Sequence, residues 1–180
     1  MKRFLALALA FLFAQTAHAA DFTLKSPTLN PAAPLAMQHV FNGFGCEGGN
    51  VSPALTWENA PTGAKSFAVT VYDPDAPTGS GWWHWVVFNI PAATTALPEG
   101  ASTNGKLPAT AVQSMTDYGA PGFGGACPPK GDTPHRYIFT VFALDVASLD
   151  LKPGAMPAMV GFMLGQHTLA KASITVTYGR

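Results

Sequence analysis

The chain has 180 residues, of which 48% are hydrophobic and only 11% are charged, with ten basic and ten acidic side chains. A net charge of zero, without any run of Lys or Arg, excludes the electrostatic attraction that nucleic-acid binding requires. The length suits a single domain with one core.

The first 19 residues predict a secretory signal peptide. Lys2 and Arg3 form a basic start, residues 4–14 form an apolar core, and Ala17-His18-Ala19 is a small-residue cleavage site. The apolar run is too short to span a bilayer, and no later segment is long and apolar enough to do so. We therefore expect cleavage after about Ala19, export to the periplasm or the medium, no stable membrane insertion and one domain over residues 20–180.

Strand-like patterns begin soon after this segment and are separated by turn-rich loops. Alternating apolar and polar residues predict an edge strand over residues 22–26. The pattern also predicts strands over residues 37–41 and 54–58, and the first of these carries His39, which we expect to be structural rather than a ligand. Residues 42–53 contain four glycines and predict a long ordered turn.

Residues 66–72 form the clearest strand in the chain. Phe67, Val69 and Val71 fall on one face, with Asp73 next in that phase. Both faces are largely apolar, so we expect this strand to be buried on both sides in the middle of a sheet. A Gly-Ser-Gly run at residues 79–81 then permits a hairpin-like return.

The returning segment predicts a strand that ends before Pro91. Alternation places one set of its side chains together, opposite Trp85 and Val87: His84, Val86, Phe88 and Ile90. Two prolines stiffen the turn before it, so that Asp73 and Asp75 are presented at a strand end. Rigid polar groups among aromatic side chains are typical of a small-ligand site, and a proline-rich connection whose tryptophans are core residues is the alternative.

The last third of the chain predicts a strand over residues 136–145, a helix over 157–171 and a strand over 173–178. Proline suits the first turn of the helix. Five residues follow helical spacing and form one side of this helix: Met159, Phe162, Met163, Gln166 and Ala170. Val160 and Leu164 widen its apolar face. Such a helix either packs into the core or forms a homodimer. Six or seven strands and few helices predict a mostly β sandwich rather than a doubly wound α/β fold.

Two cysteines, Cys46 and Cys127, follow the predicted cleavage site. In an exported chain a disulfide is the default. Closing a loop of about 80 residues stabilises a fold by on the order of 4–5 kcal/mol in the entropic model, as an upper figure. Two free thiols in a pocket wall are the first alternative, and ligation of a metal by thiols so far apart in sequence is the weaker one.

Several motifs occur in an order that resembles the phosphatidylethanolamine-binding protein family, also called the Raf kinase inhibitor family. They are Asp73-Pro-Asp-Ala-Pro77, Trp83-His-Trp-Val-Val-Phe-Asn-Ile-Pro91 and Cys127-Pro-Pro-Lys-Gly-Asp-Thr-Pro-His-Arg-Tyr137. A further motif, Asn50-Val-Ser-Pro-Ala-Leu-Thr-Trp57, is similar to the bacterial branch of that family. The resemblance covers nearly the whole mature chain.

The resemblance implies a large antiparallel, Greek-key-like sheet packed on a smaller sheet. It also implies a surface pocket for small anions, such as phosphate or phosphorylated head groups. Carried over by motif position, the pocket residues would be Asp73, Asp75, Ala76, Pro77, His84, Gly125, Pro128, His135 and Tyr137.

Two aspartates beside two histidines have a chemical rationale in such a pocket. A carboxylate bonded to one imidazole nitrogen favours the charged ring and raises the pKa of a histidine. The other nitrogen then donates to a phosphate oxygen in a charge-assisted hydrogen bond. We therefore expect Asp73 and Asp75 to orient the two histidines. His84 and His135 then bind a small anion, to which backbone amides of the glycine pair at 124–125 add donors.

Other functions stay open at this point. The Asp–His pairs also suit general acid–base catalysis, as in a phosphoester hydrolase, but no Ser or Cys lies in a nucleophile turn. We therefore expect a binding protein without a cofactor rather than an enzyme. A metal site built from His84, His135 and an aspartate lacks tight ligand spacing. The surface alternatively binds a protein, as an inhibitor of a protease or kinase does. We expect Trp85 in the core and either Trp82 or Trp83 in the pocket wall.

Overall fold

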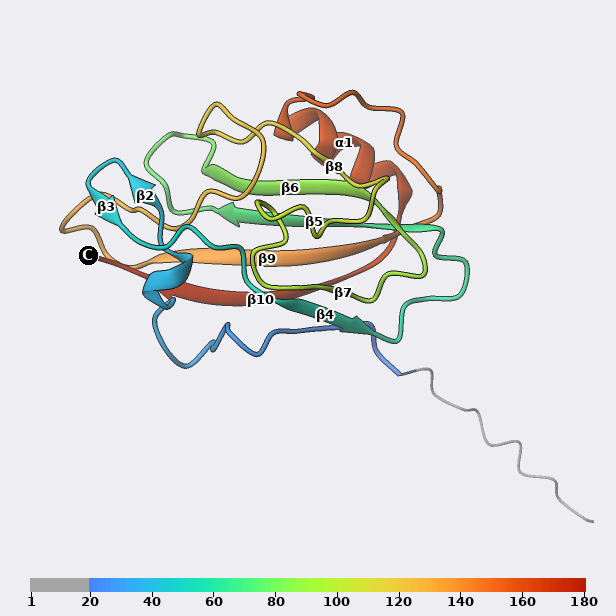
Figure 1. Cartoon of the computed structure of the whole chain (residues 1–180), viewed down its shortest axis with the longest axis horizontal. Coiled ribbons are helices and arrows are strands. Elements are labelled where there is room, and N and C mark those ends of the chain that lie inside the picture. The colour runs from blue at the N-terminus through green and yellow to red at the C-terminus, as the bar shows by residue number, and fades with distance from the viewer. Residues whose placement is uncertain (1–19) are drawn as a thin grey trace, which may run out of the picture.

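The computed structural model describes residues 20–180, so the predicted signal peptide lies outside the described residues. A five-stranded antiparallel sheet runs through this part of the chain in the order β10-β9-β5-β6-β8 (Figure 1). Its strands are β5 (Ser66–Asp73), β6 (Trp82–Pro91), β8 (Val112–Gln113), β9 (His135–Leu144) and β10 (Thr168–Tyr178). β5 lies in the middle of the sheet, which confirms its prediction as a central strand.

A smaller sheet packs on one face of the large one. It contains β1 (Thr23–Lys25), β4 (Leu55–Glu58) and β7 (Ala96–Leu97) in the order β1-β4-β7, and a separate two-stranded sheet pairs β2 (Asn42–Gly43) with β3 (Cys46–Glu47). Leu55 and Trp57 of the smaller sheet share a buried apolar cluster with Phe67 and Val69 of the large sheet. The fold is therefore mostly β, with a large antiparallel sheet on a smaller one, as predicted.

The helix α1 (Pro157–His167) covers the other face of the large sheet, and Figure 1 shows it leading directly into β10. It is shorter than predicted because Thr168 has extended backbone angles and its hydroxyl donates to the Leu164 carbonyl at 2.6 Å. The prediction of which helix residues form the buried apolar side was also wrong, since Met159 and Phe162 are exposed. The residues that the helix buries are Pro157, Val160 and Leu164. No helix within residues 20–180 is long and apolar enough to cross a membrane.

The predicted strand over residues 37–41 is instead a short 3-10 helix, η1 (Met37–His39). The carbonyls of Met37 and Gln38 accept from the amides of Gly49 and Val51 in the following loop, so no neighbouring strand pairs with them. His39 is fully buried. Its Nδ1 bonds to the Val51 carbonyl at 2.7 Å, and its Nε2 bonds to the side-chain amide of Gln38 at 3.1 Å. Its prediction as a structural histidine is thus confirmed.

The alternation predicted for β6 fails at its far end. Asn89 has a φ of 59°, in the left-handed region, and the register of β5 against β6 shifts between Phe67 and Val69. This irregularity moves Ile90 into the cluster that contains Trp85 and Val87, whereas Phe88 packs on the opposite face. The prediction that Ile90 shares a face with Phe88 was therefore wrong.

Candidate functional site

One cavity of about 200 Å³ lies where β5 ends and where β6 and β9 begin. Because β6 and β9 both run antiparallel to β5, these three strand ends lie at the same end of the sheet. Seven of the predicted pocket residues line the cavity: Asp73, Ala76, Pro77, His84, Pro128, His135 and Tyr137. Six more residues complete the lining: Phe44, Thr78, Trp82, Tyr118, Cys127 and Pro129. Asp75 and Gly125 do not line it.

Four polar lining residues are almost completely buried, with exposed fractions of 1–3%. We call these residues the floor of the cavity, and they come from the three central strands: Asp73, His84, His135 and Tyr137. Two loops at residues 43–47 and 127–130 form what we call the rim, where the Phe44 side chain is 70% exposed. The floor thus presents polar groups at the bottom of an aromatic and proline-lined opening.

A β-bulge brings His84 to the floor. Val71 pairs with Trp85, whereas Tyr72 pairs with Trp83, so His84 is an extra residue in β6. Trp83 and Val86 pack on the helix-covered face, and Trp85 packs on the opposite one. His84 therefore lies on the same side as Trp85. Strict alternation, which we used to predict the faces of this strand, places it on the wrong side.

Asp73 is held by three hydrogen bonds. Its Oδ1 accepts from the backbone amides of Asp75 at 2.8 Å and Ala76 at 3.1 Å, which shapes the turn after β5. Its Oδ2 accepts from Nδ1 of His135 at 2.7 Å, and both side chains are only 4% exposed. Nε2 of His135 lies 3.5 Å from a carboxylate oxygen of Asp132. The predicted orientation of one histidine by an aspartate is thus present for His135.

His84 is oriented differently from the prediction. Its Nδ1 donates to the carbonyls of Gly124 at 2.8 Å and Gly125 at 3.1 Å, and no aspartate within residues 20–180 bonds to the ring. Burial lowers the pKa of His84, and the two carbonyls and the charges of Asp73 and Asp117 only partly oppose this effect. The expectation of a raised pKa was therefore wrong for this histidine. When the ring is uncharged, its proton lies on Nδ1, because both carbonyls accept.

The glycine pair at 124–125 also acts differently from the prediction. The Gly124 amide donates to the His84 carbonyl at 2.8 Å, and the Gly125 amide donates to Oδ1 of Asn50 at 2.7 Å. Neither amide is left for an anion, so the predicted backbone donors are absent here. A Cβ on Gly125 would lie 2.3 Å from the His39 carbonyl, which explains why glycine is required.

Asp75 points away from the cavity. Its two carboxylate oxygens accept from Nη2 of Arg136 at 2.7 Å and from Nε at 2.9 Å, and the Arg136 amide adds a third bond at 2.8 Å. These bonds, led by the guanidinium, lower the pKa of Asp75 to about 2. The prediction that Asp75 orients a pocket histidine was therefore wrong, because Asp75 lies in the turn after the end of β5 and its carboxylate is held by Arg136.

Aromatic side chains surround the histidines. The Tyr137 ring packs edge-on against His84 with centroids 5.1 Å apart, and its buried hydroxyl has no hydrogen-bond partner within residues 20–180. Tyr118 packs edge-on against His84 and Trp82, and its hydroxyl donates to the Gly125 carbonyl at 2.7 Å. Burial, with a smaller effect of Asp73, raises the pKa of both phenols. Trp82 is the pocket-wall tryptophan that we predicted, whereas no sequence signal pointed to Tyr118.

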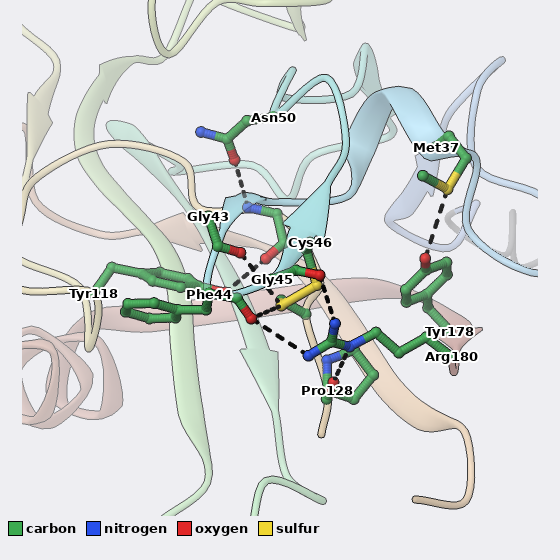
Figure 2. The surroundings of a disulfide bond; sticks show 12 residues. Met37, Gly43, Phe44, Gly45, Cys46, Asn50, Tyr118, Pro128, Tyr178 and Arg180 are labelled. Carbon is green, nitrogen blue, oxygen red and sulfur yellow. Dashed lines mark hydrogen bonds between the residues drawn. A yellow bond between two sulfur atoms is a disulfide. The ribbon is translucent and has the colours of Figure 1, made fainter. Parts of the chain in front are cut away.

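The rim is closed by a disulfide between Cys46 and Cys127, which are 81 residues apart, and this confirms the predicted pairing. Figure 2 shows Arg180 beside it, with the guanidinium placed between the two rim loops. Its Nε donates to the Pro128 carbonyl at 2.7 Å, and its Nη1 donates to the Gly45 carbonyl at 2.7 Å. Phe44 stacks on Tyr118 with centroids 5.7 Å apart (Figure 2). A covalent bond and charge-assisted hydrogen bonds from Arg180 therefore join the same two loops.

Within residues 20–180, no group of three or more His, Cys, Asp or Glu side chains has an arrangement suited to a metal ion. Both cysteines belong to the disulfide, and the Asp73 carboxylate already accepts a hydrogen bond from Nδ1 of His135. The cavity residues therefore present hydrogen-bonding atoms and aromatic surface to a ligand.

Comparison with known proteins places these features in a family. The family described as phosphatidylethanolamine-binding protein matches residues 25–179. The chain therefore belongs to the phosphatidylethanolamine-binding protein family. The UPF0098 protein YbcL of Escherichia coli is 54% identical over 165 residues, covering 91% of this chain and 90% of YbcL. The crystal structure of E. coli YbcL, described as a new member of the mammalian PEBP family, matches with a TM-score of 0.87 over 89% of this chain and 99% of that chain.

Two further relatives extend the comparison. The UPF0098 protein YbhB of E. coli is 54% identical over 156 residues, covering 86% of this chain and 98% of YbhB. A Mycobacterium tuberculosis protein named as a lipoprotein, LppC, is 36% identical over 160 residues, covering 89% of this chain and 73% of LppC. The bacterial resemblance drawn from the sequence motifs is thus confirmed.

Proposed function

We propose that the protein is an exported binding protein that holds a small phosphorylated anion in the cavity. The observation that carries this proposal is the convergence of two histidines, from β6 and β9, on one cavity. In the described part of the chain, the His84 and Tyr137 side chains each have a buried polar atom without a partner there. A buried polar atom without a partner typically costs about 1–3 kcal/mol. A ligand that bonds to these atoms recovers that free energy.

The size and the donors of the cavity suit a small head group. Pockets for drug-sized ligands usually measure about 300–1,000 Å³, whereas this cavity has a volume of about 200 Å³. The Tyr137 hydroxyl and the Trp82 indole N–H are donors in its lining, and His135 is kept in place by Asp73. Phosphate oxygens accept such bonds. The exposed Phe44 ring at the rim suits an organic group attached to the phosphate.

Two observations support a location outside the cytoplasm. The disulfide joins cysteines of the kind that persist in oxidising compartments. LppC, a relative over most of this chain, is named as a lipoprotein. Together with the predicted signal peptide, these observations support export to the periplasm or the medium.

Binding is favoured over covalent hydrolysis by the state of the candidate nucleophiles. The hydroxyl of Thr78 donates to the Gly81 carbonyl at 2.5 Å, and the sulfur of Cys127 is part of the disulfide. The phenols of Tyr118 and Tyr137 have raised pKa values, which keeps them protonated. None of these groups is an activated nucleophile. We infer that the Asp73–His135 pair orients a ligand rather than attacks it.

Calorimetric titration with phosphoethanolamine tests the proposal. Replacing His135 with Ala removes a floor histidine, and we expect affinity to fall about tenfold or more, as loss of a hydrogen bond to a charged group predicts. Tyr137→Phe keeps the ring and removes only the hydroxyl, with a smaller expected loss. The matched control is His167→Ala, because His167 also bonds to an aspartate, Asp145, but lies outside the cavity. Equal affinity in all variants, or no binding by the native protein, contradicts the proposal.

A further inference from the structure

The backbone fixes the position of the proton on His84. Nδ1 lies within hydrogen-bond distance of the Gly124 and Gly125 carbonyls, and carbonyl oxygens only accept. Nδ1 must therefore carry the hydrogen, and in the neutral ring Nε2 has a lone pair and no proton. This Nε2 is buried and has no hydrogen-bond partner within residues 20–180. Nε2, the ring nitrogen that does not bond to the backbone, is thus a hydrogen-bond acceptor without a donor within these residues.

Burial favours this neutral form of His84, against the charges that lie around it. Asp73 from β5 and Asp117, whose carboxylate accepts from the Trp83 amide, both attract a charged ring. Tyr118 and Tyr137 pack edge-on against the imidazole, and His135 lies in the same cavity lining. Among the residues that the structure describes, no Lys or Arg lines the cavity. Burial outweighs the two carboxylates, so the pKa of His84 is lowered and its Nε2 acts as an acceptor.

We propose that the cavity selects an anion that brings its own proton, a phosphomonoester monoanion whose P–O–H group donates to Nε2 of His84. This inference rests on the proposed function and specifies its ligand. A phosphomonoester has a second pKa of about 6, so its monoanion carries one hydroxyl and its dianion carries none. A phosphodiester anion has no P–O–H hydroxyl at any pH near neutrality. The head group of an intact phospholipid is a phosphodiester, so the site prefers free phosphomonoesters to lipid.

The selectivity follows from the cost of an unmet acceptor. A ligand without a hydroxyl turns the lone pairs of its oxygen toward the lone pair of Nε2 and leaves this buried acceptor unpaired. Sites built around a buried hydrogen bond reject ligands that lack the matching group much more strongly than apolar pockets reject a missing methylene. Discrimination at His84 therefore depends on one hydrogen atom of the ligand rather than on its overall charge.

Methyl phosphate and dimethyl phosphate make a matched pair for the test. At about pH 5 both carry one negative charge, and they differ by a methyl group in place of the acidic hydrogen. We expect calorimetric titration of the native protein to show methyl phosphate binding about tenfold more tightly or better, as loss of one buried hydrogen bond predicts. The advantage should disappear by about pH 8, where methyl phosphate is a dianion.

Two further measurements separate the ligand's proton from protonation of the protein. In a series of alkyl phosphonates with different second pKa values, the midpoint of the pH profile should move with the ligand. In nitrogen NMR, His84 should keep its hydrogen on Nδ1 when methyl phosphate binds. Vesicles of phosphatidylethanolamine test the lipid source of the same head group, and we expect no competition with methyl phosphate.

Each outcome has one meaning. Equal affinity for the two esters at pH 5, a preference for the diester or the vesicles, or a midpoint independent of the ligand overturns the inference and leaves anion binding intact. Absence of binding by every ester at every pH overturns the proposed function together with the inference. A monoester preference whose midpoint follows the ligand supports both.

Discussion

The floor and the rim of the cavity are held in place by different means. The floor side chains extend from β5, β6 and β9, where ladder hydrogen bonds fix the backbone, and Asp73 and His135 bond directly to each other. The rim loops belong only to the short β2–β3 pair and to irregular chain, and they are joined by the disulfide and by Arg180. The chemistry of the site is therefore set by the sheet, whereas its opening is set by links between loops.

Removing the disulfide should have the largest effect on stability. In the loop-closure model, opening a loop of this length costs about 4–5 kcal/mol as an upper figure. We expect the double variant Cys46→Ser, Cys127→Ser to lose several kcal/mol in urea unfolding and to bind phosphoethanolamine more weakly. The native protein treated with reductant provides the control. A loss below about 1 kcal/mol would show that the rim does not depend on its covalent link.

Asp73→Ala breaks the floor rather than the rim. The variant removes three accepted hydrogen bonds and leaves His135 buried without its partner, which typically costs about 3–5 kcal/mol. The control is Asp145→Ala, which removes the same kind of partner from His167. Since that pair is 29% and 50% exposed, we expect a loss below about 1 kcal/mol. If the two variants lost similar amounts of unfolding free energy, burial would not be the reason why the Asp73–His135 pair matters more.

The lowered pKa of His84 predicts a loss of stability in acid. The unfolded chain takes up this proton near the ordinary pKa of about 6.5, before the folded protein does. The stability that the neutral ring contributes is thus fully present above about pH 6.5 and is lost as pH falls toward the folded-state pKa, by at most about 1.4 kcal/mol per pH unit. Urea unfolding between about pH 7.5 and 5.5 measures it. His84→Phe should flatten this dependence, and His167→Phe should not.

Arg180→Ala should have the smallest effect. The variant removes donors to carbonyls on both rim loops, but Arg180 is exposed, so we expect a loss of at most about 1 kcal/mol in stability and faster ligand release. Arg180→Lys keeps the charge without the planar set of donors and should fall between Ala and the native residue. Release rates can be compared by stopped-flow mixing. Unchanged release in both variants would leave the disulfide as the rim link that matters.

The sequence predicted the sheet better than the orientation of its side chains. The apolar run at 66–72 identified the central strand because both of its faces are buried, and motif spacing brought Asp73, His135 and Tyr137 to one site. The position of His84 depends on one extra residue in β6, and the row of large aromatic residues around it contains no break that reveals a bulge. Tyr118 reaches the cavity only through long-range packing. A weakly patterned segment gives no local signal of such a contact.

The disulfide also determines when the site is complete. Under the proposed export, both thiols stay reduced during synthesis in the cytoplasm, and only non-covalent contacts hold the entrance loops at that stage. Oxidation after transport joins them and finishes the entrance. Under the proposed function, a protein assembled in this order reaches its full affinity for phosphorylated ligands only after it has left the compartment in which it was made.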